Sequence, residues 1–167
     1  MTEGECSKLR SLIHHANNIV LCCHVSPDGD AIGSVLGMAE VLKCMGKEPV
    51  MVVPDQFPDY LQWLPNTEKI VRYDKRSDYV DMVLKIADLV ICLDFNALSR
   101  TDDMEAALEA CTAPRVLIDH HLNPSIACQV CVSHPNMSSA SELVFRVAWQ
   151  LGLFEQLGRH FATAVYC

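Results

Sequence analysis

The chain has 167 residues, of which 50% are hydrophobic and 20% charged, so it is long enough to form one globular domain with a sizeable core. Its net charge is −8 and it has no basic stripe, which disfavours duplex DNA or an anionic membrane as a partner. Short phosphate-bearing ligands are not excluded, because bound divalent cations would supply positive charge locally. No segment approaches the ~18 uninterrupted apolar residues of a membrane span, and the acidic start at 1–5 is unlike a secretory signal, so a cytoplasmic location is expected.

The spacing of apolar residues predicts helices that alternate with short, uniformly apolar strands. In chain order the expected elements are a helix at 7–16, a strand at 18–23, a helix at 31–45, a strand at 49–53, a proline-containing loop with one helical turn, a helix at 77–87, a strand at 88–93, a helix at 101–110, strands at 115–118 and 126–132, and helices at 139–151 and from 154 onward. This alternation predicts an α/β fold with an open, mainly parallel sheet and helices on both faces.

Side chains near the helix starts agree with these boundaries. Asp102 and Asp103 would lie in the first turn of the helix at 101–110, where the helix dipole favours negative charge. Ser139 and Glu142 have the spacing of a capping box, which predicts a helix start.

The nine cysteines indicate a reducing compartment rather than a disulfide framework. Their number is odd, and Cys22, Cys23 and Cys92 lie inside apolar runs, as buried free thiols do. Cys128 and Cys131 have the CxxC spacing but no partner pair. If their segment is a strand, the two sulfur atoms point to opposite faces, so a structural role is favoured over zinc binding.

Three of the predicted strands end in side chains that can bind cations. These side chains are His24, Asp28 and Asp30 after the first strand, Asp94 after the third, and Asp119, His120 and His121 after the fourth. Parallel strands bring their carboxyl ends to one edge of the sheet, so the three clusters should meet. Carboxylates gathered in a partly buried site repel one another unless they are protonated or metal-bound, so the sequence predicts a metal site.

The ligand types narrow the choice of metal. Carboxylate and imidazole groups without thiolate suit manganese, magnesium, iron or cobalt better than a structural zinc ion. The number of groups exceeds what one ion usually takes, so two ions about 3.5 to 4 Å apart are expected. Asp94 is the carboxylate best placed to bridge them.

The joint pattern resembles the DHH phosphoesterases, a family named for the tripeptide Asp119-His120-His121. The motifs that carry the resemblance are His24-x-x-Pro27-Asp28-Gly29-Asp30-Ala31-Ile32-Gly33-Ser34, Leu93-Asp94, and Leu117-Ile118-Asp119-His120-His121. The form Asp-Gly-Asp-Ala-Ile-Gly-Ser is most similar to the branch that contains bacterial nanoRNases and phosphoadenosine-phosphate phosphatases. Family II pyrophosphatases usually have threonine or a similar residue between the two aspartates, and RecJ-type exonucleases typically lack a residue equivalent to His24.

The resemblance implies a DHH domain fold and a role for each site residue. It assigns one ion to His24, Asp28 and Asp94, and a second to Asp30, Asp94 and His120, with manganese expected in both and magnesium or cobalt as alternatives. His121 would face the substrate phosphate, and Asp119 would orient the motif. A water activated between the ions would attack phosphorus in line.

The function implied is hydrolysis of small nucleotide phosphates or short single-stranded oligoribonucleotides. Inorganic pyrophosphatase or exopolyphosphatase activity and a non-catalytic nucleotide-binding or phosphate-binding module are the alternatives, and a homodimer stays open. Related proteins continue into a Gly-x-x-x-Asp-Thr-Gly motif, whose aspartate completes the second metal site, and into a smaller substrate domain. Residues 1–167 are therefore expected to be the N-terminal DHH domain, a fragment or a truncated form, with weak or no activity alone.

Overall fold

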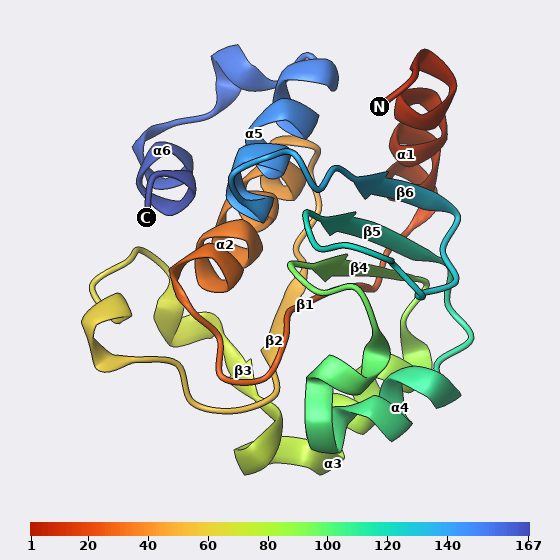
Figure 1. Cartoon of the computed structure of the whole chain (residues 1–167), viewed down its shortest axis with the longest axis vertical. Coiled ribbons are helices and arrows are strands. Elements are labelled where there is room, and N and C mark those ends of the chain that lie inside the picture. Colours follow the sequence, from red (N-terminus) through yellow and green to blue (C-terminus); the bar gives the residue numbers. More distant parts are fainter.

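The computed structural model describes all 167 residues and contains one six-stranded sheet covered by helices (Figure 1). The strand order is β3-β2-β1-β4-β5-β6, and every neighbouring pair is parallel, so the predicted open parallel α/β sheet is confirmed. The strands are β1 Ile19–Cys22, β2 Val50–Val53, β3 Val71–Arg72, β4 Leu89–Leu93, β5 Arg115–Asp119 and β6 Val130–Ser133.

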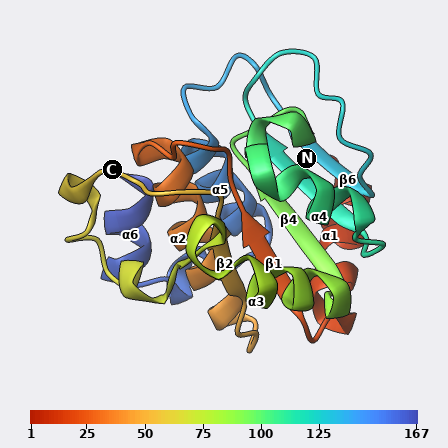
Figure 2. The same cartoon turned by 90° about the horizontal axis from the view of Figure 1, so that it is seen from below.

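Helices cover both faces of the sheet (Figures 1 and 2). The α-helices are α1 Glu3–His15, α2 Gly29–Cys44, α3 Tyr73–Ile86, α4 Glu105–Ala110, α5 Ala140–Gln150 and α6 Arg159–Val165, and short 3-10 segments occupy Asp59–Leu61, Thr67–Lys69, Leu98–Met104 and Phe154–Gln156. A core of 34 buried residues lies between the sheet and α1, α2, α5 and α6, and a smaller core of 15 lies on the side of α3 and α4. None of the helices combines the length and the hydropathy needed to cross a membrane.

The central strands are apolar throughout because both of their faces are buried. Every residue of β1 and β4 is buried. Alternate side chains of β1 enter different cores, since Leu21 belongs to the larger core and Val20 to the smaller one. The edge strand β6 instead alternates buried and exposed residues.

Two glycines let α6 approach α2 closely. A Cβ atom on Gly33 would collide with the carbonyl oxygen of Ala164 in α6, and one on Gly37 would lie 2.8 Å from Cγ1 of Val165. Helix α6 therefore packs directly on the α2 backbone, and its C-terminal end reaches the start of α2, as Figure 1 shows. The Sγ atom of Cys167 lies 3.6 Å from the position of a Cβ on Gly29.

Several predicted boundaries were wrong for local reasons. Asp102 has φ 48° and ψ −125°, which breaks the helix expected at 101–110 into a 3-10 segment and α4, so Asp102 and Asp103 do not lie in the first turn of an α-helix. The strand expected at 126–132 begins only at Val130. The last predicted helix is interrupted before Gly158, the N-cap of α6. The two-residue strand β3 was not predicted, because it is too short to show a periodicity.

Candidate metal centre

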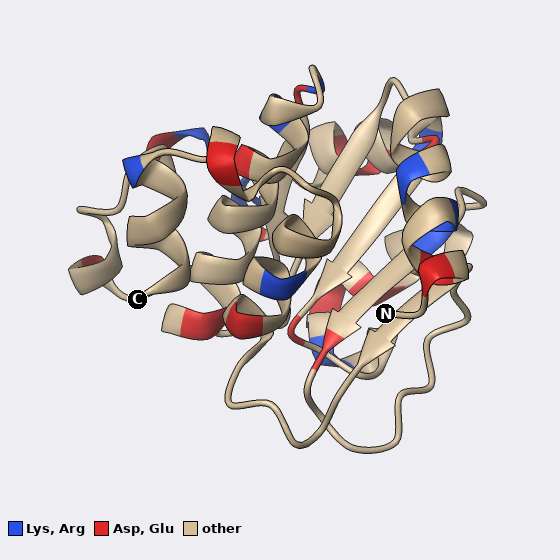
Figure 3. Ribbon diagram, turned by 90° about the horizontal axis from the view of Figure 1, so that it is seen from above, with Lys and Arg blue, Asp and Glu red and all other residues tan.

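The predicted ligands meet at the carboxyl ends of the central strands. Chain order runs outward from β1 to β3 on one side and from β4 to β6 on the other, so the order reverses between β1 and β4. Open α/β sheets bind ligands at such a switch point. His24 follows β1, Asp94 follows β4 and Asp119 ends β5. In Figure 3, acidic positions accordingly lie at the tips of the strands.

Asp94 lies at the centre of the site and is 2% exposed. Its φ of 63° falls in the left-handed region, which is uncommon for a residue with a side chain, and its N–H donates to the carbonyl of Ile118 at 3.0 Å. Burial raises the pKa of Asp94, an effect that contact with His24 opposes and the charge of Asp30 reinforces. The buried Oδ1 atom has no hydrogen-bond partner. A buried carboxylate of this kind fits the coordination of a cation.

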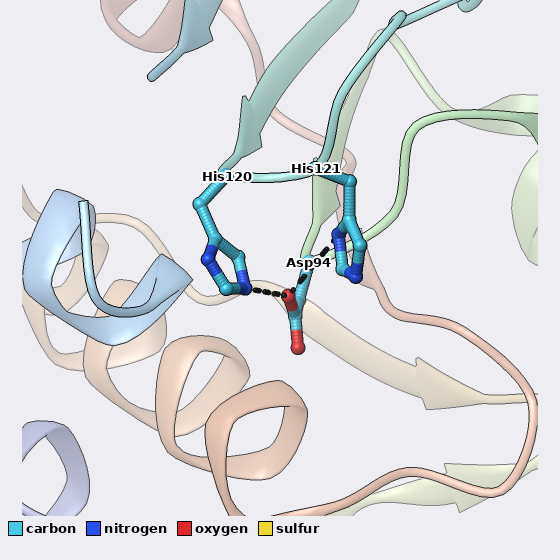
Figure 4. Close-up of side chains that lie close together, drawn as sticks. All are labelled: Asp94, His120 and His121. Carbon is cyan, nitrogen blue, oxygen red and sulfur yellow. Dashed lines mark ion pairs between the residues drawn. The ribbon is translucent and has the colours of Figure 1, made fainter. Parts of the chain in front are cut away.

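The two oxygens of Asp94 face two different groups of side chains. Oδ2 lies 3.5 Å from Nε2 of His24, and His24, Asp28 and Asp94 form one group whose ligand atoms are all within 4.8 Å of one another. Oδ1 lies 3.4 Å from Nε2 of His120 and 3.7 Å from Nδ1 of His121, and these three residues form a second group (Figure 4). This arrangement suits a carboxylate that bridges two cations.

A backbone contact fixes the orientation of the His24 ring. Its Nδ1 atom lies 2.7 Å from the carbonyl oxygen of Val25, which can only accept a hydrogen bond, so Nδ1 carries the proton and Nε2 faces Asp94. Burial alone would lower the pKa of His24, but Asp94 and the Val25 carbonyl raise it overall. Histidine ligands of metals commonly donate their second N–H to a carbonyl in this way.

Asp28 and Asp30 both interact with helix N-termini. Asp28 is the N-cap of α2, and its Oδ1 atom accepts from the N–H of Ala31 at 3.0 Å, which leaves Oδ2 available. The carboxylate oxygens of Asp30 accept from the N–H groups of Ala140 and Ser141 in α5, each at 2.8 Å. Oδ2 of Asp30 also lies 3.5 Å from Nε2 of His120, although Asp30 belongs to neither of the two compact groups.

His121 is held by Asp119. Its Nδ1 atom lies 2.7 Å from Oδ1 of Asp119, whose side chain is fully buried and whose Oδ2 atom has no hydrogen-bond partner. The Asp119 carboxylate therefore fixes the orientation of the imidazole. The structure also places His121 with Asp94 and His120 in a group that could hold a metal, whereas the family resemblance assigned His121 to the substrate phosphate.

Two further contacts support the loop between β1 and α2 and were missed in the sequence. Asp55, just after β2, accepts a 2.6 Å hydrogen bond from the N–H of Ser26, which has φ 52°. The carbonyl of Arg100, in the segment after β4, accepts from the N–H of Val25 at 2.8 Å. The rule that polar residues follow parallel strands could have found Asp55, whereas nothing in the sequence marks the backbone contact of Arg100.

Residues 18–167 match the family model described as the DHH family, N-terminal domain. The chain belongs to the DHH family. The resemblance read from the sequence motifs is thus confirmed, and the match covers nearly all of the chain.

Two relatives of this DHH chain share substantial sequence identity with it. The bifunctional oligoribonuclease and PAP phosphatase NrnA of Thermus thermophilus is 33% identical over 129 residues, which are 75% of this chain and 35% of NrnA. The crystal structure of an exopolyphosphatase-related protein from Bacteroides fragilis has a TM-score of 0.96 and 39% identity, and covers 99% of this chain and 48% of that protein. The chain thus spans about a third of NrnA and about half of the Bacteroides protein.

A more distant structure shares the fold alone. RecJ of Thermus thermophilus, solved in complex with Mn2+, has a TM-score of 0.56 and 13% identity to this DHH chain. The likeness covers 97% of this chain and 22% of RecJ. The six-stranded arrangement is therefore that of a DHH domain.

Proposed function

We propose that this DHH chain is the metal-binding part of a divalent-metal-dependent phosphoesterase that hydrolyses small nucleotide phosphates or short oligoribonucleotides. The observation that carries the proposal is the buried Asp94 carboxylate, whose two oxygens face separate groups of imidazole and carboxylate ligands. The kinship with NrnA, described as an oligoribonuclease and PAP phosphatase, favours nucleotide substrates.

The donor set favours a metal that prefers oxygen and nitrogen. One ion would be held by His24, Asp28 and Asp94, and a second by Asp30, Asp94 and His120. Cys23 lies beside this site, but burial and the charges of Asp94 and Asp28 raise the pKa of its thiol well above the ordinary value. The Sγ atom of Cys23 donates to the carbonyl oxygen of His24 at 3.7 Å, and neither group of potential ligands includes a cysteine, so the donor set favours manganese over a thiolate-bound zinc ion.

The protein groups around the ions would position the substrate. Two bound ions would supply an activated water and neutralise the phosphoryl oxygens. His121, oriented by Asp119, would present its other ring nitrogen to a phosphoryl oxygen and stabilise the charge that develops there. The contacts of Asp55 and Arg100 would keep the loop that carries Asp28 in place.

A second candidate is an inorganic pyrophosphatase or exopolyphosphatase. The Bacteroides relative, described as exopolyphosphatase-related, supports this alternative. A non-catalytic nucleotide-binding or phosphate-binding module is the third candidate, since the same groups of potential ligands would serve binding without turnover. The three candidates differ in substrate and in whether turnover occurs at all.

The experiment that tests the proposal measures manganese binding and hydrolysis with the same protein. The chain is incubated with Mn2+ and one substrate in each reaction. The substrates are phosphoadenosine phosphate, a phosphorylated RNA dinucleotide, pyrophosphate and polyphosphate. We expect manganese-dependent release of product from the nucleotide substrates. Faster hydrolysis of pyrophosphate or polyphosphate would favour the second candidate.

The variant Asp94→Ala separates an enzyme from a binding module. In a phosphoesterase, loss of the bridging carboxylate should remove both metal binding and turnover. The matched control is Asp103→Ala, because Asp103 is exposed and belongs to neither group of potential ligands. Metal-independent nucleotide binding that survives Asp94→Ala, with no turnover in either protein, would overturn the proposal in favour of the binding module.

A further inference from the structure

A row of cysteines crosses the face of the sheet that packs on α3 and α4. The strand register aligns Cys22 of β1 with Cys92 of β4, Cys92 with Leu117 of β5, and Leu117 with Cys131 of β6. Side chains at aligned positions of neighbouring strands project to the same face. Cys22, Cys92 and Leu117 are buried in the smaller core, and Cys131, on the edge strand, is exposed. The row therefore ends in an accessible thiol.

Cys128 reaches the same face from the loop before β6. The chain bends at Gln129, whose N–H donates to the carbonyl of Arg115 at 2.8 Å and whose side-chain oxygen accepts from the N–H of Arg115 at 2.6 Å. Cys128 is half-buried and packs against the smaller core. Burial raises the pKa of Cys128, and the neighbouring Cys131 thiol is among the groups that raise it further, so the two thiols lie near each other.

The position of Cys128 against the smaller core, on the face to which the register assigns Cys131, corrects the expectation that the two sulfur atoms point to opposite faces. That expectation assumed that both cysteines lie in one strand, but β6 begins at Val130, after Cys128. The alternation of a strand therefore does not apply to Cys128. The CxxC spacing instead brings together one exposed and one half-buried thiol at the sheet edge.

We propose that Cys128 and Cys131 form an accessible dithiol, which a low-molecular-weight disulfide such as glutathione disulfide converts to an intramolecular disulfide. In the first step the Cys131 thiolate attacks one sulfur of glutathione disulfide, the S–S bond breaks, and one glutathione thiolate leaves. In the second step the Cys128 thiolate attacks Sγ of Cys131 and expels the second glutathione. Two protein thiols are oxidised and one small disulfide is reduced to two thiols.

The environments of the two cysteines determine the order of attack. Burial, followed by the neighbouring Cys131 thiol, raises the pKa of Cys128 to about 11. Since the thiolate is the attacking species, the exposed Cys131 reacts first and Cys128 resolves the mixed disulfide. The second step should accelerate as pH rises, because a larger fraction of Cys128 is then ionised.

The experiment oxidises the folded chain and detects the result in a tryptic peptide that contains Cys128 and Cys131 but no other cysteine. Cleavage after Arg115 and Arg146 releases residues 116–146, which include Cys128 and Cys131 alone. The folded chain is equilibrated with mixtures of reduced and oxidised glutathione, quenched by alkylation, digested and analysed by mass spectrometry. We expect part of this peptide to be unalkylated and two hydrogen masses lighter than the reduced peptide. This fraction of the peptide should rise with the proportion of glutathione that is oxidised.

Serine variants separate the two roles. Cys128→Ser should accumulate a mixed disulfide with glutathione on Cys131, and Cys128→Ala serves the same purpose if the serine variant folds poorly. In Cys131→Ser, Cys128 should not react with glutathione, so its thiol should be alkylated in the quench. Peptide 1–8 is the internal control, because it carries Cys6 alone and should show only a mixed disulfide. A wild-type peptide 116–146 that keeps two alkylated thiols, or retains glutathione on Cys131 without an internal disulfide, would overturn the proposal.

Discussion

Asp94 combines three features, each of which costs free energy when no cation is bound. It is a buried carboxylate, it has a positive φ, and one of its oxygens lacks a hydrogen-bond partner. Strained residues of this kind persist where the surrounding structure holds them, and they concentrate at functional sites. A cation between Asp94, His120 and His121 would satisfy the free Oδ1 atom and offset the buried charge.

Asp94→Asn should therefore stabilise the metal-free chain while removing its response to manganese. The amide keeps the side-chain volume but removes a buried negative charge that faces Asp28 and Asp30. Wild-type protein at a manganese concentration of 100 times its Kd should gain about 2.7 kcal/mol, and the variant should gain close to none. Thermal unfolding with and without Mn2+ measures both effects.

The control for this variant is Asp103→Asn, the same change at an exposed acidic residue. It should keep the full stabilisation by manganese. Equal stabilisation of wild type and Asp94→Asn by manganese would contradict a bridging role for Asp94.

For single residues, the sequence predicted which ligand types meet but not the backbone contacts that position them. The positions of His24, Asp94 and Asp119 follow from the rule that parallel strands end at one edge. The hydrogen bonds to Asp30 and the positive φ of Asp94 did not follow, because they depend on backbone groups of α5 and of Ile118 that only the folded chain brings near.

Among the helices, α5 has a direct connection to the site through its first turn. The N–H groups at a helix start lack partners within the helix, and here two of them bind the Asp30 carboxylate. The side chain of Ser141 adds a third contact, donating to the Asp30 carbonyl at 3.2 Å. The position of α5 therefore sets the orientation of one predicted ligand of the second ion.

Ala140→Pro tests this connection, because it deletes one of the two N–H donors at a helix position that tolerates proline. Ala140 is the first residue of α5, and the preceding Ser139 has the extended backbone that proline requires (φ −161°, ψ 161°). We expect manganese binding at one of two sites to weaken by about 10- to 100-fold, the usual effect of losing a group that orients a ligand. Titration followed by electron paramagnetic resonance of Mn2+ would resolve the two sites.

Glu3→Pro is the matched control, since Glu3 is the first residue of α1, whose N-cap is Thr2. This substitution should leave both manganese sites unchanged. If the two proline variants titrate alike, the contact between α5 and Asp30 does not matter for metal binding.

The same helix end should give the protein an acid-sensitive contribution to stability. Hydrogen bonds from Ser138 and Arg146 lower the pKa of Glu142 from 4.5 to about 2. Because the folded pKa is the lower one, the stabilisation is complete above pH 4.5 and is lost as the pH falls toward 2. Glu142→Gln should cost about 1 kcal/mol at pH 7, allowing for screening by solvent, and the difference should disappear at low pH.

Urea unfolding of both proteins between pH 7 and pH 2 would measure this difference. Glu109→Gln is the control, as Glu109 is exposed and forms no ion pair. A gap between wild type and Glu142→Gln that stays constant over this range would argue against the contribution of Glu142.

Elements with a strong local pattern were predicted better than elements defined by their neighbours. The central strands β1 and β4 are continuous apolar runs, and α5 begins after Ser139, as its capping pattern indicated. Strand β3 exists only because Val71 and Arg72 pair with the end of β2, and no local signal marks it. The break at Asp102 likewise has no local signal, because nothing in the sequence marks the backbone angles of φ 48° and ψ −125° at this residue.

For the molecule as a whole, close packing of α6 on α2 fixes the C-terminal segment to the core. Gly33→Ala should disrupt this packing, because the added methyl group would meet the backbone of Ala164 and approach the Oγ atom of Ser141 to 3.0 Å. We expect a loss of about 1–3 kcal/mol in the free energy of unfolding, typical of overpacking. Denaturation in urea gives the value.

Gly4→Ala provides the comparison, since no atom lies within 4 Å of a Cβ at that position in α1. There the gain in helix propensity should leave the protein as stable or more stable by up to about 1 kcal/mol. A Gly33→Ala protein as stable as wild type would mean that α6 can shift away from α2 at little cost.

The strand order divides the sheet into two halves. Along the sheet, β1 and β4 form the sole strand pair between the half built from β1 to β3 and the half built from β4 to β6. The group of His24, Asp28 and Asp94 lies at the end of this pair and draws on both halves, whereas Asp94, His120 and His121 all follow strands of the second half. A cation bound by His24, Asp28 and Asp94 would therefore link the two halves, so separation of β1 from β4 would also release that cation.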